Sequence, residues 1–366
     1  MKSTQALHNV GQSLWLDNVT RALLNDGTLR RYIDELSLTG LTSNPTIFDH
    51  AIRSSADYDE EVKRKSATAK SAEALFFELA VNDLSRAADL FQPTFARTDG
   101  VDGWVSLEVS PLLAHDTDST LKAAQSLHKS AGKPNLFIKI PGTPEGLPAI
   151  EAAIFAGIPV NVTLLFSSDQ YVAANDAYMR GVERRIAAGL NPAVGSVASV
   201  FISRWDVAVA TKVPHELANR LGIAVAGRCY RAYREMLASP RFARAANEGA
   251  RAQRLLWAST GTKDPNAPDT LYVKALASPF TVNTMPENTL HAFADHGVVG
   301  DVLAPDGGDC EAVIAAFGKA GIDVKALAAQ LQDEGAASFV QSWNELMGII
   351  EQKISQKTAG PREPVR

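Results

Sequence analysis

The sequence predicts an α/β fold in which eight short parallel strands alternate with helices, and a single (β/α)8 TIM barrel with additional helices accommodates all of them. Short apolar runs recur along the chain, longer segments of helical spacing separate them, and no repeat of fixed period is present. The chain has 366 residues, and barrels of this class often exceed about 250 residues as one domain. We therefore expect residues 1–355 to form one barrel domain with C-terminal helices, and residues 356–366 to form a disordered tail.

The composition is that of a globular protein able to bury a large core. Apolar residues make up 46% of the chain, charged residues make up 21%, and the net charge is -5. This mildly acidic balance, without basic runs among aromatic residues, argues against a nucleic-acid partner. No stretch approaches the roughly 18 apolar residues of a membrane span, and no apolar signal-peptide core follows Met1. We expect a cytoplasmic protein without a membrane partner. Two cysteines, Cys229 and Cys310, are too few for a disulfide scaffold or a cysteine zinc site.

The first two predicted strands end in polar residues. Strand 13–16 is followed by Asp17, which either caps the next helix or belongs to a site; Asp is a common cap, and this stretch alone favours that interpretation. Strand 36–41 leads into Thr42-Ser43-Asn44-Pro45, where the proline keeps Asn44 extended and can begin a helix.

Charged residues interrupt the third and fourth predicted strands. Glu108 lies in strand 104–110. If it is buried, its carboxylate needs a cation or a proton; alternatively, it faces solvent at the strand end. Lys139 lies in the apolar run 137–140, which is typical of a strand buried on both faces. Desolvation disfavours the charged form of a buried amine, and the neutral amine can attack a carbonyl to form a Schiff base. Taken alone, a lysine whose head reaches water is the commoner arrangement.

Polar residues also mark the fifth, sixth and seventh predicted strands. Strand 159–166 places Asn161 and Thr163 on one face, as expected for a site on the inward side. Arg204 follows strand 197–202, at the end of a barrel where loops bind phosphate; it could instead form a surface ion pair with Asp206. The small, basic segment 259–263 after strand 255–258 is a weak anion-binding signal.

The chain after the predicted eighth strand, 280–286, is expected to be helical. We predict helices at 311–319 and 324–333 and a longer one that carries an apolar stripe of Phe339, Trp343, Met347 and Ile350. Such a stripe predicts packing against the barrel or a partner subunit rather than chemistry.

Several of these segments together match one family. They are Asp17, Thr42-Ser43-Asn44-Pro45, Ser106-Leu107-Glu108-Val109, Phe137-Ile138-Lys139-Ile140-Pro141, Asn161-Val162-Thr163-Leu164-Leu165-Phe166-Ser167 and Ser199-Val200-Phe201-Ile202-Ser203-Arg204. In this order, over roughly residues 10 to 355, the chain resembles transaldolase, and segments 257–263 and 282–286 look like its longer-chain branch.

The resemblance implies a class I aldolase-type barrel with a Schiff-base lysine on the fourth strand. It implies the pentose phosphate pathway reaction, in which a dihydroxyacetone unit moves from sedoheptulose 7-phosphate or fructose 6-phosphate to glyceraldehyde 3-phosphate or erythrose 4-phosphate. It implies no metal or organic cofactor, sugar phosphates as small-molecule partners, and a monomer or homodimer.

The resemblance also implies roles for individual residues. Lys139 forms the iminium, Asp17 is the general base and later the acid, and Glu108 and Thr163 hold the water that makes and hydrolyses the carbinolamine. Arg204 binds the phosphate. The other expected substrate-binding residues are Thr42, Asn44, Asn161, Ser199, Phe201, Ser259 and Lys263.

The chain departs from the family pattern at two points. Shorter members carry an arginine directly after the seventh-strand serine, whereas this chain has Thr260 and Gly261 there, and we expect Lys263 to substitute. Ser203 stands where glycine is common. Phe201 stands where fructose 6-phosphate aldolases tend to have tyrosine, which favours transfer over release. A lyase of that type and a non-catalytic phosphate-binding barrel are the alternatives.

Overall fold

Eight parallel strands close into a barrel in a computed structural model that describes residues 1–66 and 69–358. Every strand pairs with its neighbours in sequence, and β1 pairs with β8 to complete the ring. The predicted fold class is thus confirmed. The strands are β1 (Ser13–Asp17), β2 (Leu38–Thr42), β3 (Trp104–Glu108), β4 (Leu136–Pro141), β5 (Val160–Leu165), β6 (Ser196–Phe201), β7 (Gln253–Ala258) and β8 (Val282–Met285).

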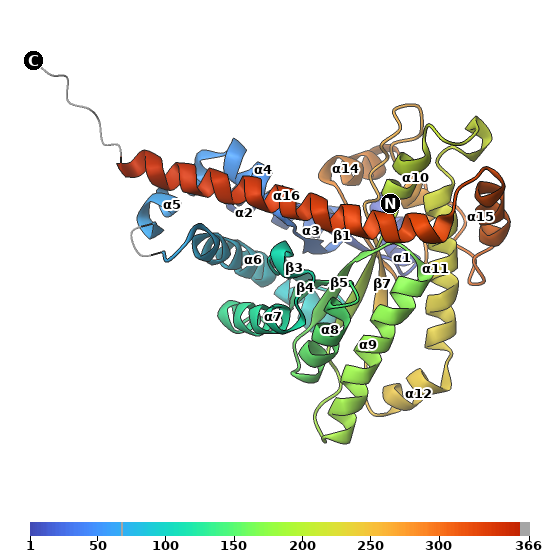
Figure 1. Ribbon diagram of the computed structural model, residues 1–366, viewed down its shortest axis with the longest axis horizontal. Coiled ribbons are helices and arrows are strands. Elements are labelled where there is room, and N and C mark those ends of the chain that lie inside the picture. The colour runs from blue at the N-terminus through green and yellow to red at the C-terminus, as the bar shows by residue number, and fades with distance from the viewer. Residues whose placement is uncertain (67–68, 359–366) are drawn as a thin grey trace, which may run out of the picture.

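Helices surround the barrel and cover its outer face (Figure 1). In chain order they are α1 (Ser3–Asn9), α2 (Arg21–Asn25), α3 (Thr28–Leu36), α4 (Pro45–Ser54), α5 (Asp59–Lys65), α6 (Ala72–Arg97), α7 (Thr117–Ala131), α8 (Gly146–Phe155), α9 (Ser168–Ala187), α10 (Ser203–Val209), α11 (Leu221–Leu237), α12 (Pro240–Asn247), α13 (Leu271–Ala275), α14 (Glu287–His296), α15 (Cys310–Lys319) and α16 (Val324–Thr358). None of the helices in the described part of the chain has the length and apolarity needed to cross a membrane.

Local sequence signals place the loops at the carboxyl ends of the strands. Asn44 caps α4 by accepting from the backbone N–H of Ile47, and Pro45 occupies the first turn, where it loses no intrahelical bond. Thr20, rather than Asp17, caps the helix after β1. The interpretation of Asp17 as a helix cap is therefore wrong, and its carboxylate remains available to the barrel mouth.

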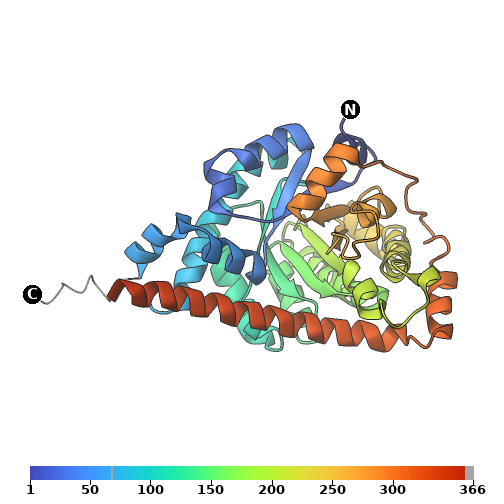
Figure 2. The same cartoon turned by 90° about the horizontal axis from the view of Figure 1, so that it is seen from above.

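The C-terminal region differs from the prediction. Residues predicted as separate helices at 324–333 and beyond form one helix, α16, which runs along the molecule in both views (Figures 1 and 2). No proline interrupts the segment, and Gly335 alone does not end a helix that tertiary packing holds. The helix includes residues 356–358 of the predicted tail, and 359–366 lie outside the described residues.

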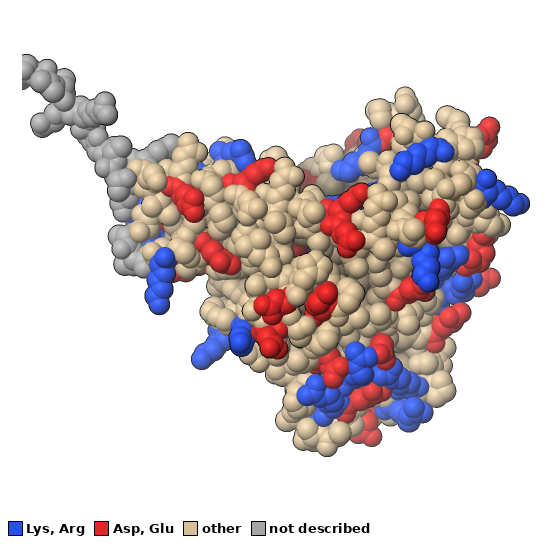
Figure 3. All heavy atoms as spheres, viewed as in Figure 1, with Lys and Arg blue, Asp and Glu red and all other residues tan. Residues whose placement is uncertain are grey.

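The apolar stripe of α16 packs within this chain, as predicted. Trp343 meets the ring of Phe76 of α6 edge-to-face at 5.1 Å between centroids, and Phe339 and Ile350 are buried. Elsewhere the surface carries charges of both signs. Over α8, α9 and α12 the side chains form the mixed cluster seen in Figure 3, with ion pairs among Arg180, Arg184, Arg241, Glu151, Asp176 and Glu183.

Candidate active site

A cavity of about 500 Å³ opens at the carboxyl ends of the strands, beneath α16. Barrels of this architecture carry their chemistry at this end. Ten of the twelve residues singled out in the sequence line the cavity, namely Asp17, Thr42, Asn44, Lys139, Thr163, Ser199, Phe201, Arg204, Ser259 and Lys263. The remaining two, Glu108 and Asn161, contact lining residues from inside the wall.

Glu108 and Lys139 form a buried ion pair. They are register partners on β3 and β4. Lys139 Nζ lies 3.1 Å from Glu108 Oε2, and the side chains of Lys139 and Glu108 are 5% and 4% exposed. The amine also donates to the carbonyl oxygen of Ser43 at 3.2 Å. Neither side chain reaches solvent, so the interpretations of a snorkelling lysine and of a solvent-facing glutamate are both wrong.

Burial sets the protonation chemistry of this pair. Desolvation raises the pKa of the Glu108 carboxyl, Lys139 opposes that shift, and the negative charge of Asp17 adds to it. Glu108 Oε1 and Thr163 Oγ1 are buried and have no hydrogen-bond partner among the described residues. A carboxyl of raised pKa beside an amine can take up and return a proton, and the two unpartnered oxygens suit a bound water or hydroxyl.

Asp17 is positioned by threonines on the two neighbouring strands. Thr42 Oγ1 donates to Asp17 Oδ1 at 2.8 Å and lies 2.8 Å from Thr284 Oγ1. Asp17 is only half-buried, so its second oxygen can face a ligand. The arrangement gives the cavity a second carboxylate besides that of Glu108.

Asn161 braces the wall of the cavity instead of lining it. It is fully buried, its amide nitrogen donates to Ser106 Oγ at 3.1 Å, and its carbonyl oxygen accepts from Ser199 Oγ at 2.7 Å. Because its polar atoms already have partners, direct binding of a sugar hydroxyl would require an exchange of hydrogen bonds. Its expected role in substrate binding stays a prediction.

Arg204 supplies positive charge to the mouth of the cavity. Its guanidinium carbon lies 5.2 Å from the ring centroid of Phe201 and 5.8 Å from that of Phe339. Burial lowers its pKa from the ordinary value, and Glu334 opposes that effect. Asp206 accepts instead from the N–H groups of Leu221 and Gly222, so the alternative of an Arg204–Asp206 surface pair is wrong.

Comparison with known proteins identifies the family of this chain. A model described as Transaldolase/Fructose-6-phosphate aldolase matches residues 14–350. The chain belongs to this transaldolase family. Among the relatives named "Transaldolase", that of Arthrobacter sp. (strain FB24) is 44% identical over 357 residues, covering 95% of this chain and 96% of the relative. That of Saccharopolyspora erythraea is 44% identical over 359 residues, covering 96% and 98%, and that of Mycobacterium tuberculosis (strain ATCC 25618 / H37Rv) is 43% identical over 352 residues, covering 93% and 94%.

The solved structures add no argument to this assignment. A putative fructose-1,6-biphosphate aldolase from Coccidioides immitis covers 96% of this chain and 94% of its own at 11% identity, with a TM-score of 0.26. The transaldolase family therefore rests on sequence, and the fold on the closed ring of strands.

Several residues that line this transaldolase-family cavity were not predicted as site residues. Phe339 of α16 places its ring centroid 5.8 Å from Lys139 Nζ, although its stripe predicted only packing. Thr284 and His50 also line the cavity. No local pattern distinguishes Phe339 or His50, since each lies in an ordinary helix and meets the site only through tertiary structure. Thr284 lies in segment 282–286, which belongs to the family resemblance but gave this residue no role.

Two of the six non-glycine residues with positive φ in the described part of the chain lie at the same mouth. Leu164 and Ser259 both have positive φ, at 60° and 56°, and both lie at or next to a strand end. The carbonyl of Leu164 accepts from Gln332 Nε2 at 2.8 Å, and Ser259 Oγ lies 2.9 Å from Ser203 Oγ. Uncommon conformations held in this way are typical of functional sites.

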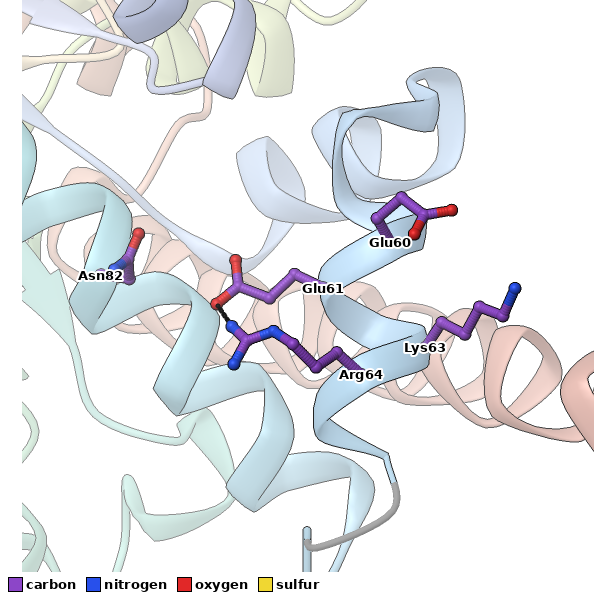
Figure 4. Close-up of a pocket in the computed structure, with 5 residues that line it drawn as sticks. All are labelled: Glu60, Glu61, Lys63, Arg64 and Asn82. Atoms are coloured by element: carbon purple, nitrogen blue, oxygen red, sulfur yellow. Dashed lines mark hydrogen bonds and ion pairs between the residues drawn. The ribbon is translucent and has the colours of Figure 1, made fainter.

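Other features of the described residues do not compete with this site. A shallow cleft between α5 and α6 is formed by Glu60, Glu61, Lys63, Arg64 and Asn82, with Arg64 Nη2 3.4 Å from Glu61 Oε1 (Figure 4). None of these lining residues belongs to a strand. Within residues 1–66 and 69–358, no group of three or more His, Cys, Asp or Glu side chains is arranged to hold a metal ion.

Proposed function

We propose that this protein is a transaldolase that moves a dihydroxyacetone unit between sugar phosphates through a Schiff base on Lys139. The donors are sedoheptulose 7-phosphate or fructose 6-phosphate, and the acceptors are glyceraldehyde 3-phosphate or erythrose 4-phosphate, as in the pentose phosphate pathway. The observation that carries the proposal is the buried Lys139 amine, 3.1 Å from Glu108, in a cavity that Asp17 and Arg204 also line. Relatives named transaldolase over most of the chain support the same activity.

The first step joins the amine to the ketose. Lys139 first gives one proton to Glu108, the adjacent carboxylate whose pKa burial raises, and the neutral Nζ then attacks the carbonyl carbon C2. The C2 oxygen receives one proton from the attacking nitrogen and a second from Glu108, and leaves as water, which the unpartnered Thr163 Oγ1 and Glu108 Oε1 are suited to hold. The product is a protonated iminium that draws electrons from the neighbouring C3–C4 bond.

The second step breaks and re-forms a carbon–carbon bond. Asp17 accepts the proton of the C4 hydroxyl, the C4–O bond becomes a carbonyl, and the C3–C4 electrons move into the iminium to give an enamine. After the first aldose leaves, the enamine carbon attacks the aldehyde of the acceptor, and Asp17 returns its proton to the new alkoxide. The hydrogen bond from Thr42 fixes the orientation that this proton transfer needs.

The cationic end of the cavity can bind the phosphate of either sugar. Arg204 presents planar donors suited to bidentate phosphate binding, and Lys263 lines the same cavity as a second cation. The aromatic rings that flank Arg204 favour an organic substrate over bulk water near the amine.

Borohydride trapping tests the proposal directly. Protein incubated with fructose 6-phosphate and borohydride should gain the mass of one reduced dihydroxyacetone or ketose adduct, and peptide mapping should place it on Lys139. The Lys263→Ala variant, which keeps Lys139 but lacks the other lysine of the cavity, should still be trapped, and Lys139→Ala should not. An unmodified Lys139 in active-site peptides would favour the non-catalytic phosphate-binding barrel.

A lyase of the fructose 6-phosphate aldolase type is the remaining alternative within the family. We propose transfer because Phe201, rather than tyrosine, faces the cavity. Incubation with fructose 6-phosphate, with and without erythrose 4-phosphate, separates the two, since a transaldolase turns over only with the acceptor. Substantial free dihydroxyacetone without an acceptor would favour the lyase. A cytoplasmic location and a monomer or homodimer stay predictions from the sequence.

A further inference from the structure

A second cavity, of about 630 Å³, lies at the opposite end of the barrel. We call it the basal cavity. Its walls come from the amino ends of strands, including Ser13 of β1, Trp104 of β3 and Arg254 of β7, and from the segment before β3 that holds Val101 and Asp102. It shares no lining residue with the catalytic cavity. The chemistry proposed for Lys139 leaves it unexplained.

The inner wall of the basal cavity is flat, aromatic and fixed. The rings of Trp104 and Phe137 stack with centroids 4.0 Å apart and planes 17° from parallel, and both residues are buried. Gly195 faces this pair so closely that a Cβ atom there would lie 2.7 Å from the Trp104 ring. Trp104 and Phe137 are only 5% and 1% exposed, so the pair gives the cavity a rigid apolar floor, and the apolar surface open to a ligand lies at the rim.

Apolar side chains at the rim remain in solvent. Val101 is 52% exposed and Phe280 is 63% exposed. Phe280 has a φ of 62°, uncommon for a bulky residue, and two bonds hold it there: its N–H donates to Gly11 O at 2.8 Å, and its carbonyl accepts from Tyr233 OH at 2.9 Å. Such a strained but well-held residue that presents an aromatic ring to water is typical of a binding site.

The charges at the rim include one exchangeable cation. Arg254 is largely satisfied, because it donates to the carbonyls of Val101 and Thr281 at 2.9 Å and lies 3.7 Å from buried Asp102. Arg251 pairs with Asp99 at 3.2 Å, but the Asp99 side chain is 100% exposed. An ion pair of that kind contributes little, so a ligand anion can replace Asp99 at small cost.

Arg251 also stands where the basal cavity adjoins another hollow. That hollow, of about 330 Å³, shares Gly100, Trp104, Gly195 and Arg251 with the basal cavity. Arg251 therefore stands where two regions of open space meet. A ligand whose apolar body lies on the rim can reach this cation with an acidic group.

We propose that the basal cavity binds an amphipathic organic anion, with its apolar body against Val101 and Phe280 at the rim and a carboxylate, sulfonate or similar group on Arg251. The volume lies within the roughly 300–1,000 Å³ of small-molecule sites. The exposed apolar rim and the weakly held cation both favour this class over a sugar phosphate, which has no apolar body.

The probe for a test is 8-anilinonaphthalene-1-sulfonate, whose fluorescence rises and shifts to the blue in apolar surroundings. The full chain should bind it saturably with one site, and saturating fructose 6-phosphate should not displace it. Arg251→Ala and Val101→Asp should each raise the dissociation constant about tenfold or more. Val101 is 52% exposed and the Arg251 side chain is 29% exposed, so both variants should keep the near-UV circular dichroism of the parent. Arg204→Ala, which removes a cation from the other end of the barrel, should leave the dissociation constant unchanged.

Several results would overturn the proposal. They are absence of saturable binding, displacement by fructose 6-phosphate, loss of binding in Arg204→Ala, or equal affinity in the parent, Arg251→Ala and Val101→Asp. Sedimentation of the same samples covers one more outcome: a dimer that Val101→Asp dissociates would show that a second copy of the chain, not a small anion, covers this rim.

Discussion

Replacing Lys139 by methionine measures how much the buried ion pair contributes to the free energy of unfolding. Methionine keeps a similar apolar volume, but it removes the cation that lies 3.1 Å from Glu108. The two side chains are 5% and 4% exposed, so water cannot take the place of the amine. Breaking a buried pair on one side typically costs about 3–5 kcal/mol, because the other charge stays buried without compensation.

The pH dependence of that cost identifies Glu108 as its source. Burial already raises the pKa of Glu108 above its ordinary value of 4.5, and loss of Lys139 removes the main effect that opposes the rise. The folded state then holds the Glu108 proton more tightly than the unfolded state does. The stability that this proton contributes is fully present below about pH 4.5 and is lost as the pH rises through the raised pKa of Glu108. The variant should therefore be close to wild type near about pH 5 and about 3–5 kcal/mol less stable near about pH 8.

Urea unfolding followed by tryptophan fluorescence at the two pH values measures this difference. The double variant Lys139→Met, Glu108→Gln is the matched control, since glutamine cannot ionise and its stability should depend on pH no more than that of wild type. Equal destabilisation of the single variant at both pH values would refute the reasoning, as would a double variant that keeps the pH dependence of the single one.

The remaining predictions concern turnover. Asp17→Asn should still be trapped by borohydride but should transfer about 10²–10⁴ times more slowly, in a coupled assay of erythrose 4-phosphate consumption; full activity would reject its role as the base. Arg204→Ala should lose about 1.5–3 kcal/mol of transition-state binding for fructose 6-phosphate, measured as kcat/KM, with no loss for unphosphorylated fructose. Gly335→Ala would put a Cβ atom 3.3 Å from Arg204 Nη1 and 3.0 Å from Leu164 Cδ2. KM should therefore rise several-fold, although alanine favours the helix by about 1 kcal/mol. An unchanged KM would show that the guanidinium can move aside. Phe339→Ala should increase the share of free dihydroxyacetone among the products, because water gains access to Lys139, and an unchanged product ratio would count against that role.

The chemistry of the barrel wall was predictable because charge inside an apolar strand is rare. Glu108, Lys139 and Asn161 occupy paired register positions on β3, β4 and β5, and parallel neighbours bring such residues to one level of the barrel. Their sequence signal is local, since each polar residue interrupts a run of apolar ones. The geometry among them, including the partner that Ser43 offers through its carbonyl oxygen, depends on which strands meet.

The contribution of α16 could not be found in this way. Phe339 is apolar like the other members of its stripe, and Lys139, whose amine lies 5.8 Å from its ring, is 200 positions away in sequence. A helical stripe of apolar residues predicts burial but does not say against what. The predicted helix end at Asp333 is wrong for a related reason. Helix length in a folded protein follows tertiary packing more than local preference.

One face of α16 connects these observations. Gln332 donates to the carbonyls of Gly142 and Leu164, Gly335 allows Arg204 to approach, Phe339 lies over Lys139, and Ser342 accepts from Thr46 of α4. The spacings of three, four and three residues place all four positions on the same side of the helix. A shift of α16 along its axis would therefore move the aromatic cover of the amine and the space beside the phosphate-binding arginine together. Because Gln332 bonds to the loop after β4 and to the end of β5, its hydrogen bonds fix the register of this helix over the mouth of the barrel.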